Sequence, residues 1–304
     1  MCSFFVYMKT KVVRKFICSI VPRLCLVKQI GDVCSMWVCY SVFRKHRKWM
    51  YEESGTEYNV KISSGVVENK TIFVFWRQGF ENAPDVVKKC ILSLRKNLGE
   101  YALVLLDEKN LHEYVNLPEY IVNLKTRGLI GEPQYSDLIR TNLLIRYGGV
   151  WCDATCFWQE KIPSSVESST MFVFKTVLLK ENCSPIKCSN WFIKAERNNL
   201  ILRRLQNFLF EYYKYYSQPI HYFIYHIALS MIVDCDENCR KIWDGIPYVC
   251  NMNPHVFMYS FALPFDDYRY QSILRTSFVH KLTYKISNSV RSDSSNILNH
   301  FLKC

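Results

Sequence analysis

The sequence predicts an α/β protein built on a doubly wound, mainly parallel sheet. Three short apolar runs, at 72–76, 101–106 and 150–152, have the length and composition of buried strands. Helical patterns separate these runs, and strands that alternate with helices are typical of parallel sheets. Hydrophobic residues make up 49% of the 304 residues, enough for a chain of this length to bury a large core.

Helix signals fill the intervals between the first strands. Pro84 opens a helix whose apolar residues recur on one face and which ends at Gly99. A second helix is predicted over 118–128, and a third over 136–147, where the glycine pair 148–149 stops it.

The region after residue 160 is less regular. Segments 171–179 and 189–195 are predicted strands, and 198–216 and 221–233 are predicted helices. Ligands of doubly wound sheets bind beyond the carboxyl ends of the strands. Trp76, Asp107 and Asp153 are expected at those ends.

Positive charge is concentrated at the N-terminus. The net charge is +12, and the first fifty residues hold ten Lys or Arg against Asp32 alone, which leaves +9 there. Basic and apolar clusters alternate, so we expect residues 1–65 to form a basic amphipathic helical extension that contacts an anionic membrane surface. The alternative is a pair of ordinary surface helices packed on the main domain, 66–288, with a C-terminal tail at 289–304.

Several protein classes lack their signatures here. The chain has no run of eighteen apolar residues, no secretory signal, no dinucleotide-binding glycine fingerprint and no P-loop. Its fourteen cysteines are scattered and match no zinc pattern, which favours a reducing cytosol. A nucleic-acid partner is not expected, because the charge lies mostly at one end and no recognition motif accompanies it.

A polar constellation surrounds the third predicted strand. Asp137 and Arg140 share a helix face near its N-terminus, and Asp153 follows the strand directly. A carboxylate there can hold a divalent cation, which in turn holds a diphosphate. Taken alone, Asp153 is equally an acid that caps a loop, and Asp137 and Arg140 are equally a first-turn acid and a surface ion pair.

The wider string resembles the capsular polysaccharide synthesis protein family, which is related to glycosyltransferase family 32. The likeness covers roughly 70–285, and its motifs occur in the family's order. They are Ile72-Phe73-Val74-Phe75-Trp76-Arg77-Gln78-Gly79, Leu106-Asp107, Tyr135-Ser136-Asp137-Leu138-Ile139-Arg140, Tyr147-Gly148-Gly149-Val150-Trp151-Cys152-Asp153, Ser189-Asn190-Trp191-Phe192, Ile246-Pro247-Tyr248, Asn253-Pro254-His255 and His280-Lys281-Leu282-Thr283-Tyr284-Lys285.

The resemblance implies a function. It implies a GT-A fold, a nucleoside-diphosphate sugar donor such as a UDP-hexose, and transfer with retention of anomeric configuration. The implied acceptor is a lipid-linked oligosaccharide of bacterial capsule or surface polysaccharide synthesis. The enzyme would then be cytoplasmic and peripherally bound to the inner face of the cell membrane. Thr155 replaces a carboxylate of the family motif, which leaves a catalytically silent membrane-associated scaffold as the alternative.

The resemblance also assigns residues to the diphosphate site. Asp153 matches the first carboxylate of a D-x-D-like motif, and Thr155 stands where the second would be. His280 matches a late histidine that reaches the metal or the diphosphate, so Asp153 and His280 are the expected ligands of Mn²⁺ or Mg²⁺. Strict metal dependence is open because of Thr155. Lys281 is expected to neutralise charge on the departing nucleotide.

Sugar and nucleoside contacts complete the prediction. Asp137 and Arg140 are expected to contact the donor sugar, and Asn190 to lie on the sugar's face. Trp76 and Gln78 are placed where a uracil or ribose would pack, although Trp76 is equally a core residue. Asp107 is a candidate nucleoside contact with similar alternatives. A lone histidine such as His255 is more often structural than functional.

Overall fold

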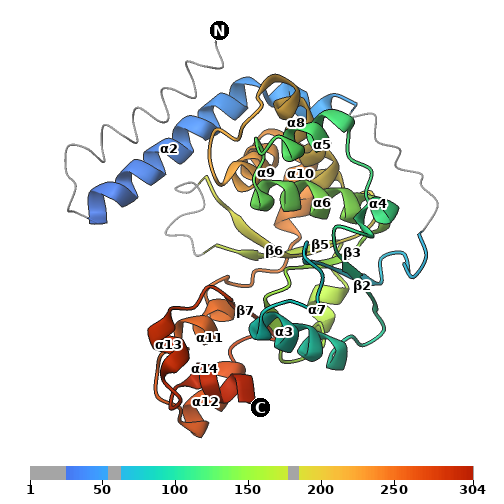
Figure 1. Ribbon diagram of the computed structural model, residues 1–304. Helices are drawn as coiled ribbons and strands as arrows, with labels where there is room; N and C mark the ends of the chain where they lie inside the picture. The colour runs from blue at the N-terminus through green and yellow to red at the C-terminus, as the bar shows by residue number, and fades with distance from the viewer. Residues whose placement is uncertain (1–24, 54–62, 177–184, 304) are drawn as a thin grey trace.

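A five-stranded sheet forms the centre of the protein in a computed structural model that describes residues 25–53, 63–176 and 185–303 (Figure 1). Its strand order is β2-β1-β3-β6-β5. The strands are β1 (Thr71–Phe75), β2 (Ala102–Leu106), β3 (Gly149–Cys152), β5 (Met171–Lys175) and β6 (Cys188–Ala195). The apolar runs predicted as strands are therefore confirmed, although 177–179 of the predicted fourth strand lie outside the described residues.

The sheet is mixed rather than mainly parallel throughout. β1 pairs in parallel with β2 and β3, as the alternation of strands and helices predicts. β6, however, runs antiparallel to both of its neighbours, β3 and β5. The α/β class is confirmed, and the reversed strand is a correction to the sheet's expected direction.

Helices cover both faces of the sheet. Figure 1 shows α5, α6, α8, α9 and α10 on one side, and α3 and α7 on the other. α6 contacts β1, β3 and β6, and α9 contacts β6. The bounds are α3 Asp85–Lys96, α4 Leu111–Tyr114, α5 Glu119–Thr126, α6 Glu132–Tyr147, α7 Ser164–Glu167, α8 Leu200–Tyr215, α9 Ile224–Cys235 and α10 Glu237–Asp244.

Helix α6 begins one turn earlier than its pattern predicts. Gly131 precedes it and Pro133 lies in its first turn, a position where proline's missing N–H costs nothing. At its other end Gly148 and Gly149 have φ of 66° and 95°. A Cβ on Gly149 would lie 2.2 Å from the carbonyl oxygen of Thr71, so the glycine lets β3 approach β1.

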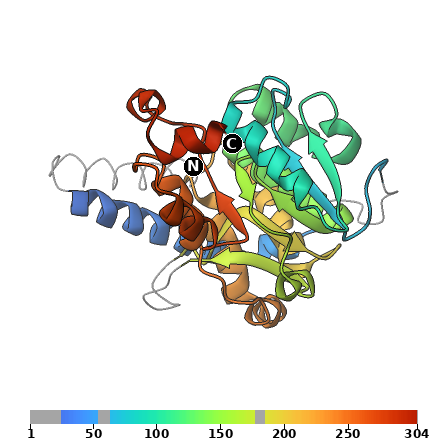
Figure 2. The ribbon, with the colours of Figure 1, turned by 90° about the horizontal axis from the view of Figure 1, so that it is seen from below.

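A second, smaller core lies beyond the main sheet. It is built around a two-stranded antiparallel sheet of β4 (Cys156–Trp158) and β7 (Val279–Lys281), with four short helices drawn in orange and red in Figure 2. These are α11 (Val256–Tyr259), α12 (Asp267–Leu274), α13 (Asn288–Ser292) and α14 (Ile297–Lys303), and η2 (Asn253–His255) precedes them.

The segment predicted as a C-terminal tail is part of this second core. Ile297, Leu298 and Phe301 of α14 are buried there, and α14 contacts α3. The segment is therefore packed like the rest of the domain, because every fourth residue or so of α14 is a large apolar side chain.

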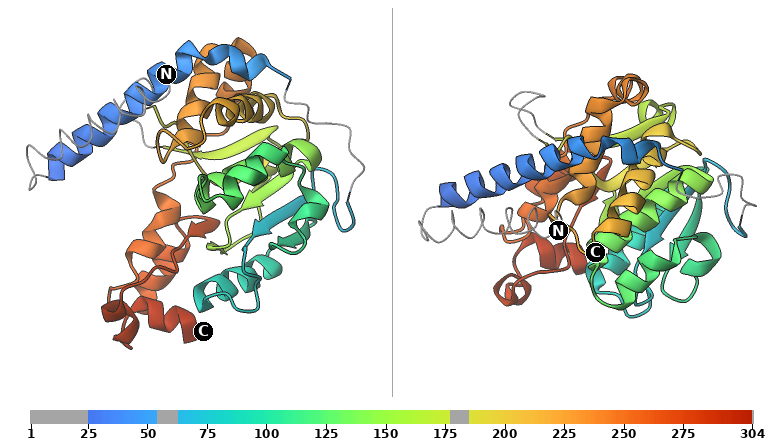
Figure 3. Two further views of the ribbon diagram at one scale, coloured as in Figure 1. Left: turned by 45° about the horizontal axis from the view of Figure 1, so that its top comes forward. Right: turned by 90° about the horizontal axis from the view of Figure 1, so that it is seen from above.

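The described part of the basic extension is a long helix followed by a short turn of 3₁₀ helix. α2 (Cys25–Lys45) extends outward from the body along one side in Figure 3, and η1 is Arg47–Tyr51. Near its end Phe43 packs on Phe208 of α8 with ring centroids 4.9 Å apart, and Tyr40 donates a hydrogen bond to Asp234 at 2.8 Å. Residues 1–24 and 54–62 of the predicted extension lie outside the described residues. In the described ranges, no helix combines the length and apolar character that crossing a bilayer requires.

Candidate functional site

A cleft of about 850 Å³ opens at the carboxyl ends of β1 and β3. That volume is typical of small-ligand sites. Trp76 follows β1 and Asp153 follows β3, so the parallel pairing brings these two positions to the same edge of the sheet. Of the residues predicted for the site, the cleft is lined by Trp76, Gln78, Asp137, Arg140, Asp153, Asn190 and Lys281.

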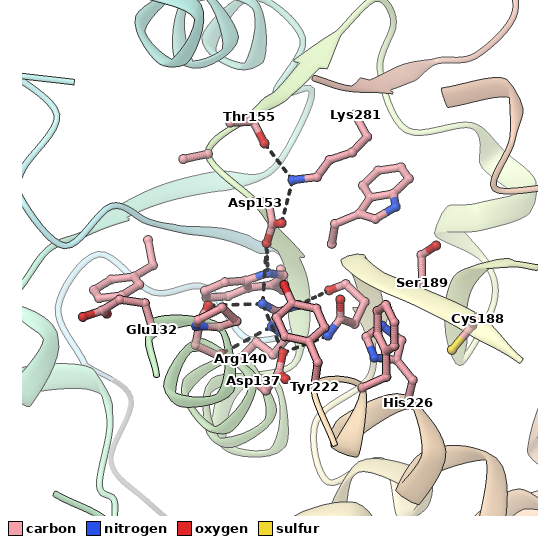
Figure 4. A pocket seen from close by; sticks show the side chains of 18 of the residues that line it. Glu132, Asp137, Arg140, Asp153, Thr155, Cys188, Ser189, Tyr222, His226 and Lys281 are labelled. Atoms are coloured by element: carbon pink, nitrogen blue, oxygen red, sulfur yellow. Dashed lines mark hydrogen bonds and ion pairs between the residues drawn. The ribbon is translucent and has the colours of Figure 1, made fainter. Parts of the chain in front are cut away.

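Helix α6 presents Asp137 and Arg140 to the cleft. Both side chains are almost fully buried, with 6% and 5% of their surface exposed. Arg140 Nη2 lies 3.4 Å from Asp137 Oδ1 and 3.7 Å from Asp153 Oδ1. Figure 4 shows Arg140 between the two carboxylates, which it holds apart and partly neutralises.

Arg140 is itself fixed from three sides. Its guanidinium donates hydrogen bonds to the hydroxyl of Ser136 at 3.1 Å and to the carbonyl of Asn190, and it lies over the ring of Trp151 with 4.9 Å to the centroid. The Asn190 amide in turn donates to Asp137 Oδ1 at 2.8 Å. This closed network orients Asp137 and Asn190 relative to each other without a ligand.

Asp153 is held by Trp151 of the preceding strand, β3, and by two cations, Arg140 and Lys281. Trp151 Nε1 donates to Oδ1 at 3.0 Å, and Lys281 Nζ donates to Oδ2 at 2.7 Å. The Asp153 backbone N–H donates to the carbonyl of Trp191 at 2.8 Å, which fixes the end of β3 against β6.

Lys281 reaches the cleft because of the register between β4 and β7. Cys156 pairs with Lys281, and the Leu282 N–H donates to the Thr155 carbonyl at 2.8 Å. The Lys281 ammonium therefore lies beside the Asp153–Thr155 turn. It donates to Thr155 Oγ1 at 2.7 Å as well as to Asp153.

The two carboxylates have opposite pKa shifts. Burial raises the pKa of Asp137 to about 7, against the opposing effect of Arg140. For Asp153, burial also acts to raise the pKa, but Lys281 and Arg140 outweigh it and hold the pKa below its ordinary value. Burial acts to lower the pKa of Lys281, yet Asp153 raises it overall. Near neutral pH, Asp153 and Lys281 are thus a charged pair, and Asp137 is close to its midpoint.

Aromatic side chains form the walls of the cleft. Trp76 is half-buried and meets Tyr284 edge-on, with ring centroids 5.2 Å apart. On the other side Trp191 of β6 stacks on Phe174 at 4.6 Å and meets His255 edge-on at 5.8 Å. An open wall such as Trp76 suits a flat ring, whereas Trp191 is 5% exposed and mainly supports the wall.

The structure does not bring His280 to the cleft. His280 has no exposed surface, its Nε2 donates to the carbonyl of Leu274 at 3.0 Å, and its ring lies 5.6 Å from that of Phe257. Successive residues of a strand point to opposite sides. Because Lys281 faces the cleft, its neighbour His280 faces the second core, which corrects its predicted role as a metal ligand.

Asp107 also lies outside the lining of this cleft. Its Oδ1 accepts hydrogen bonds from the backbone N–H of Lys109 at 2.8 Å and of Asn110 at 3.2 Å. It therefore shapes the turn after β2, a common structural role for an aspartate. The predicted nucleoside contact at Asp107 is not supported by this placement.

The residues around Asp153 are a poor fit for a divalent cation. Within the described ranges, no three His, Cys, Asp or Glu side chains gather as a metal-binding group. Thr155 supplies a hydroxyl where a carboxylate is expected, and an ammonium lies 2.7 Å from both Thr155 Oγ1 and Asp153 Oδ2. The Mn²⁺ or Mg²⁺ predicted from the resemblance would have to displace that charged, hydrogen-bonded group.

Sequence reasoning missed two aromatic residues at the mouth of the cleft. Tyr222, two residues before α9, and His226, in the first turn of that helix, line it (Figure 4). Burial, and then Arg140, lower the pKa of His226 to about 3, so its ring is neutral. The available signal was a histidine that interrupts the apolar run of 220–233, since a polar residue in an apolar helix often faces a cavity.

The model of the capsular polysaccharide synthesis protein family matches residues 40–301, most of the chain. The chain belongs to this family. The match begins within α2 and ends within α14, so the residues of both the cleft and the second core lie inside it.

The chain is also similar to a curated protein and to a solved structure. A stretch of 101 residues is 33% identical to the O-glycosyltransferase braB of Annulohypoxylon truncatum, which covers 30% of this chain and 24% of that protein. The chain therefore spans about a quarter of that relative's length. Among solved structures, PaToxG glycosyltransferase matches 71% of this chain and 84% of its own, at 14% identity and a TM-score of 0.37.

Proposed function

We propose that this protein transfers a sugar from a nucleoside-diphosphate donor, such as a UDP-hexose, to a glycan acceptor of capsular polysaccharide synthesis. The observation that carries the proposal is the ion-paired cluster of Asp137, Arg140, Asp153 and Lys281 in a cleft at the carboxyl ends of β1 and β3. Membership of the family and the similarity to an O-glycosyltransferase support the same reaction class.

We infer the orientation of the donor from the chemistry of the two ends of the cleft. The nucleoside base packs on Trp76, whose ring is half-exposed, with Gln78 beside it. The diphosphate lies near Lys281, a positive group held in position by its neighbours. The sugar then faces Asp137 and Asn190, whose side chains are already hydrogen-bonded to each other and so are pre-oriented.

Retention of anomeric configuration is part of the proposal. An inverting transferase needs a side-chain base that takes a proton from the acceptor. The carboxylates that line the cleft are all ion-paired: Glu132 with Arg77, Asp137 with Arg140, and Asp153 with Lys281. Positioning of both sugars and stabilisation of the leaving diphosphate are therefore what the protein supplies. Proton NMR of the first-formed product tests this, and an inverted product would contradict it and direct attention to Asp137, whose pKa of about 7 suits a general base, and to His255.

The experiment that tests the function is a nucleotide-sugar panel. Release of the nucleoside diphosphate is measured for UDP-, GDP-, CDP- and ADP-sugars, with water and with oligosaccharide acceptors. We expect turnover with one donor class, and Asp153→Asn should lower it by about 10²-fold or more. Asp267→Asn, an exposed carboxylate of α12, is the matched control. A panel with no binding and no turnover would favour the silent scaffold instead.

A lipid-linked acceptor on an anionic membrane surface is the second part of the proposal. Arg44, Lys45, Arg47 and Lys48 are all exposed at the junction of α2 and η1. Trp37 is also exposed, on the preceding turns of α2. Basic side chains next to aromatic ones are typical of surfaces that bind anionic lipid headgroups.

Vesicle binding tests this surface. Arg47→Ala with Lys48→Ala should weaken co-sedimentation with vesicles that contain phosphatidylglycerol by about 30-fold, since each basic residue contributes about 1 kcal/mol and the pair about 2 kcal/mol. Arg95→Ala with Lys96→Ala, which removes two exposed charges from α3, is the matched control. Equal binding of both variants and the native protein would contradict the assignment.

A further inference from the structure

The geometry points to an internal cation: the ammonium of Lys281 takes the place of the divalent metal in binding the donor's diphosphate. This inference rests on the proposed transferase function and specifies how its phosphate site operates. It departs from the metal site that the family resemblance implies, and it follows from the contacts of Asp153, Thr155 and Lys281.

Lys281 lies where a metal-binding motif would hold its ion. Asp153 and Thr155 occupy the two ligand positions of the motif, and Lys281 Nζ is 2.7 Å from an oxygen of each. Figure 4 shows the ammonium between these two side chains. One positive group, covalently attached to the chain, thus bridges the two oxygens that would otherwise share a cation.

The backbone fixes this arrangement. Lys281 is the last residue of β7 and pairs with Cys156 of β4, directly after the Asp153–Thr155 turn. The hydrogen bond from the Leu282 N–H to the Thr155 carbonyl closes the same ladder. Lysine side chains normally lose considerable rotamer entropy when they are ordered. Here that cost is met on folding, so the ammonium is in position before the donor arrives.

The ammonium retains the capacity to bind phosphate. An ammonium group has three N–H donors. In the described structure, Asp153 and Thr155 accept two of them, which leaves one for a phosphate oxygen in the cleft. The side chain of Lys281 is 20% exposed, so its ammonium is shielded from solvent but within reach of a ligand.

Charge also favours a lysine over an added ion. Arg140 already lies 3.7 Å from Asp153, so the carboxylate that pairs with Lys281 is shared between two cations. A divalent ion added there would meet two positive neighbours and one carboxylate, whereas Mg²⁺-type sites rely on carboxylates and phosphates. Lys281 and Arg140 therefore supply positive charge for a diphosphate at a place where a metal ion would meet two cations.

Binding of UDP to the full-length protein tests the inference directly. Calorimetric titrations are run once with EDTA and once with an excess of Mn²⁺ or Mg²⁺ over nucleotide. We expect the affinities to agree within about threefold. A loss of 100-fold or more in EDTA would overturn the inference. GDP, CDP and ADP are titrated in the same way.

Two failures are distinguishable in this design. If none of the four nucleoside diphosphates binds under any condition, the proposed function itself fails, and the inference fails with it. If one of them binds only with Mn²⁺ or Mg²⁺, the transferase site stands and the internal cation is wrong.

Variants convert one kind of site into the other. Lys281→Met should weaken UDP binding by at least tenfold in EDTA, whereas Lys285→Met, an exposed lysine four residues further on, should leave it unchanged. Thr155→Asp combined with Lys281→Ala supplies two carboxylates in place of the ammonium, and should bind UDP only when Mn²⁺ is added. Metal-free binding by that double variant would overturn the inference. If the variants do not fold, the comparison of EDTA and Mn²⁺ with the native protein still decides.

Discussion

The two sides of the small β4–β7 sheet differ sharply although adjacent residues supply them. On one side Lys281 enters a polar cleft and is paired with Asp153 and Thr155. On the other, His280 lies among Phe157 and Phe257 with no exposed surface. Both residues are basic in type and both match family motifs, so the side of the strand, and not the residue type, decides which one serves the site.

The largest expected effect comes from the cleft side. Lys281→Met should lower turnover by about 10²- to 10³-fold, because an ammonium that meets the leaving diphosphate stabilises charge that grows in the transition state. The midpoint of thermal unfolding should change little, since Asp153 keeps Arg140 as a partner. Turnover and thermal unfolding are measured on the same preparation. Unchanged turnover would contradict the assignment of Lys281 to the site and remove the functional difference between the two sides of the sheet.

The second largest effect is expected from His280, on the side of the β4–β7 sheet that faces the second core. His280→Ala should lower the free energy of unfolding by about 2–3 kcal/mol, because it leaves a cavity and removes the partner of the Leu274 carbonyl. UDP affinity in EDTA and in Mn²⁺ should be unaffected. Urea unfolding and calorimetry report the two quantities separately. A selective loss of Mn²⁺-dependent binding would restore His280 as a ligand.

Within the cleft, donor binding should depend on pH. Because the pKa of Asp137 is raised to about 7, the carboxyl is neutral below that pH and anionic above it. An anionic donor should therefore bind more weakly as pH rises through about 7, by a factor of several. Asp137→Asn should flatten this part of the profile, and titrations from pH 5.5 to 8.5 check it. A profile that is identical in the variant would assign the titration to another group.

The smallest effect is expected at Thr155. Thr155→Val removes one hydrogen bond to Lys281, and a single neutral acceptor contributes about 1 kcal/mol. UDP affinity in EDTA should fall by less than tenfold, well below the loss in Lys281→Met. A larger loss would mean that the hydroxyl itself contacts the donor.

Most of the fold was predictable from local patterns. β1 and β3 are buried on both faces and the edge strand β2 is half-buried, and all three appear as continuous apolar segments in the sequence. α3 shows a clear apolar stripe. β4 and β7 were missed because each has three residues, too few for a period to be visible. The antiparallel direction of β6 was also not predictable, since the sequence of one strand does not show whether it pairs in parallel or antiparallel.

Most residues of the site were predictable from the motifs, but their contacts in the folded protein were not. Asp137, Arg140, Asp153, Asn190 and Lys281 were all expected, and the structure brings them to one cleft. His280 and Asp107 were expected for the same reasons and lie elsewhere. A motif shows which residues are close together in the chain. It does not show which of two neighbouring strand residues faces the cleft, because successive side chains point to opposite sides.

Local sequence patterns were enough to predict the α/β class, the helices around the first three strands, the motif at the end of β3 and the family. They do not show which side of β7 meets the cleft, that β6 runs antiparallel to its neighbours, or that an ammonium lies between Asp153 and Thr155; these follow from the folded structure. The physical reason is that local patterns record burial, which each residue carries in its own chemistry. Register and pairing depend on partners more than a hundred residues away in the chain, as the hydrogen bond between Lys281 and Asp153 does.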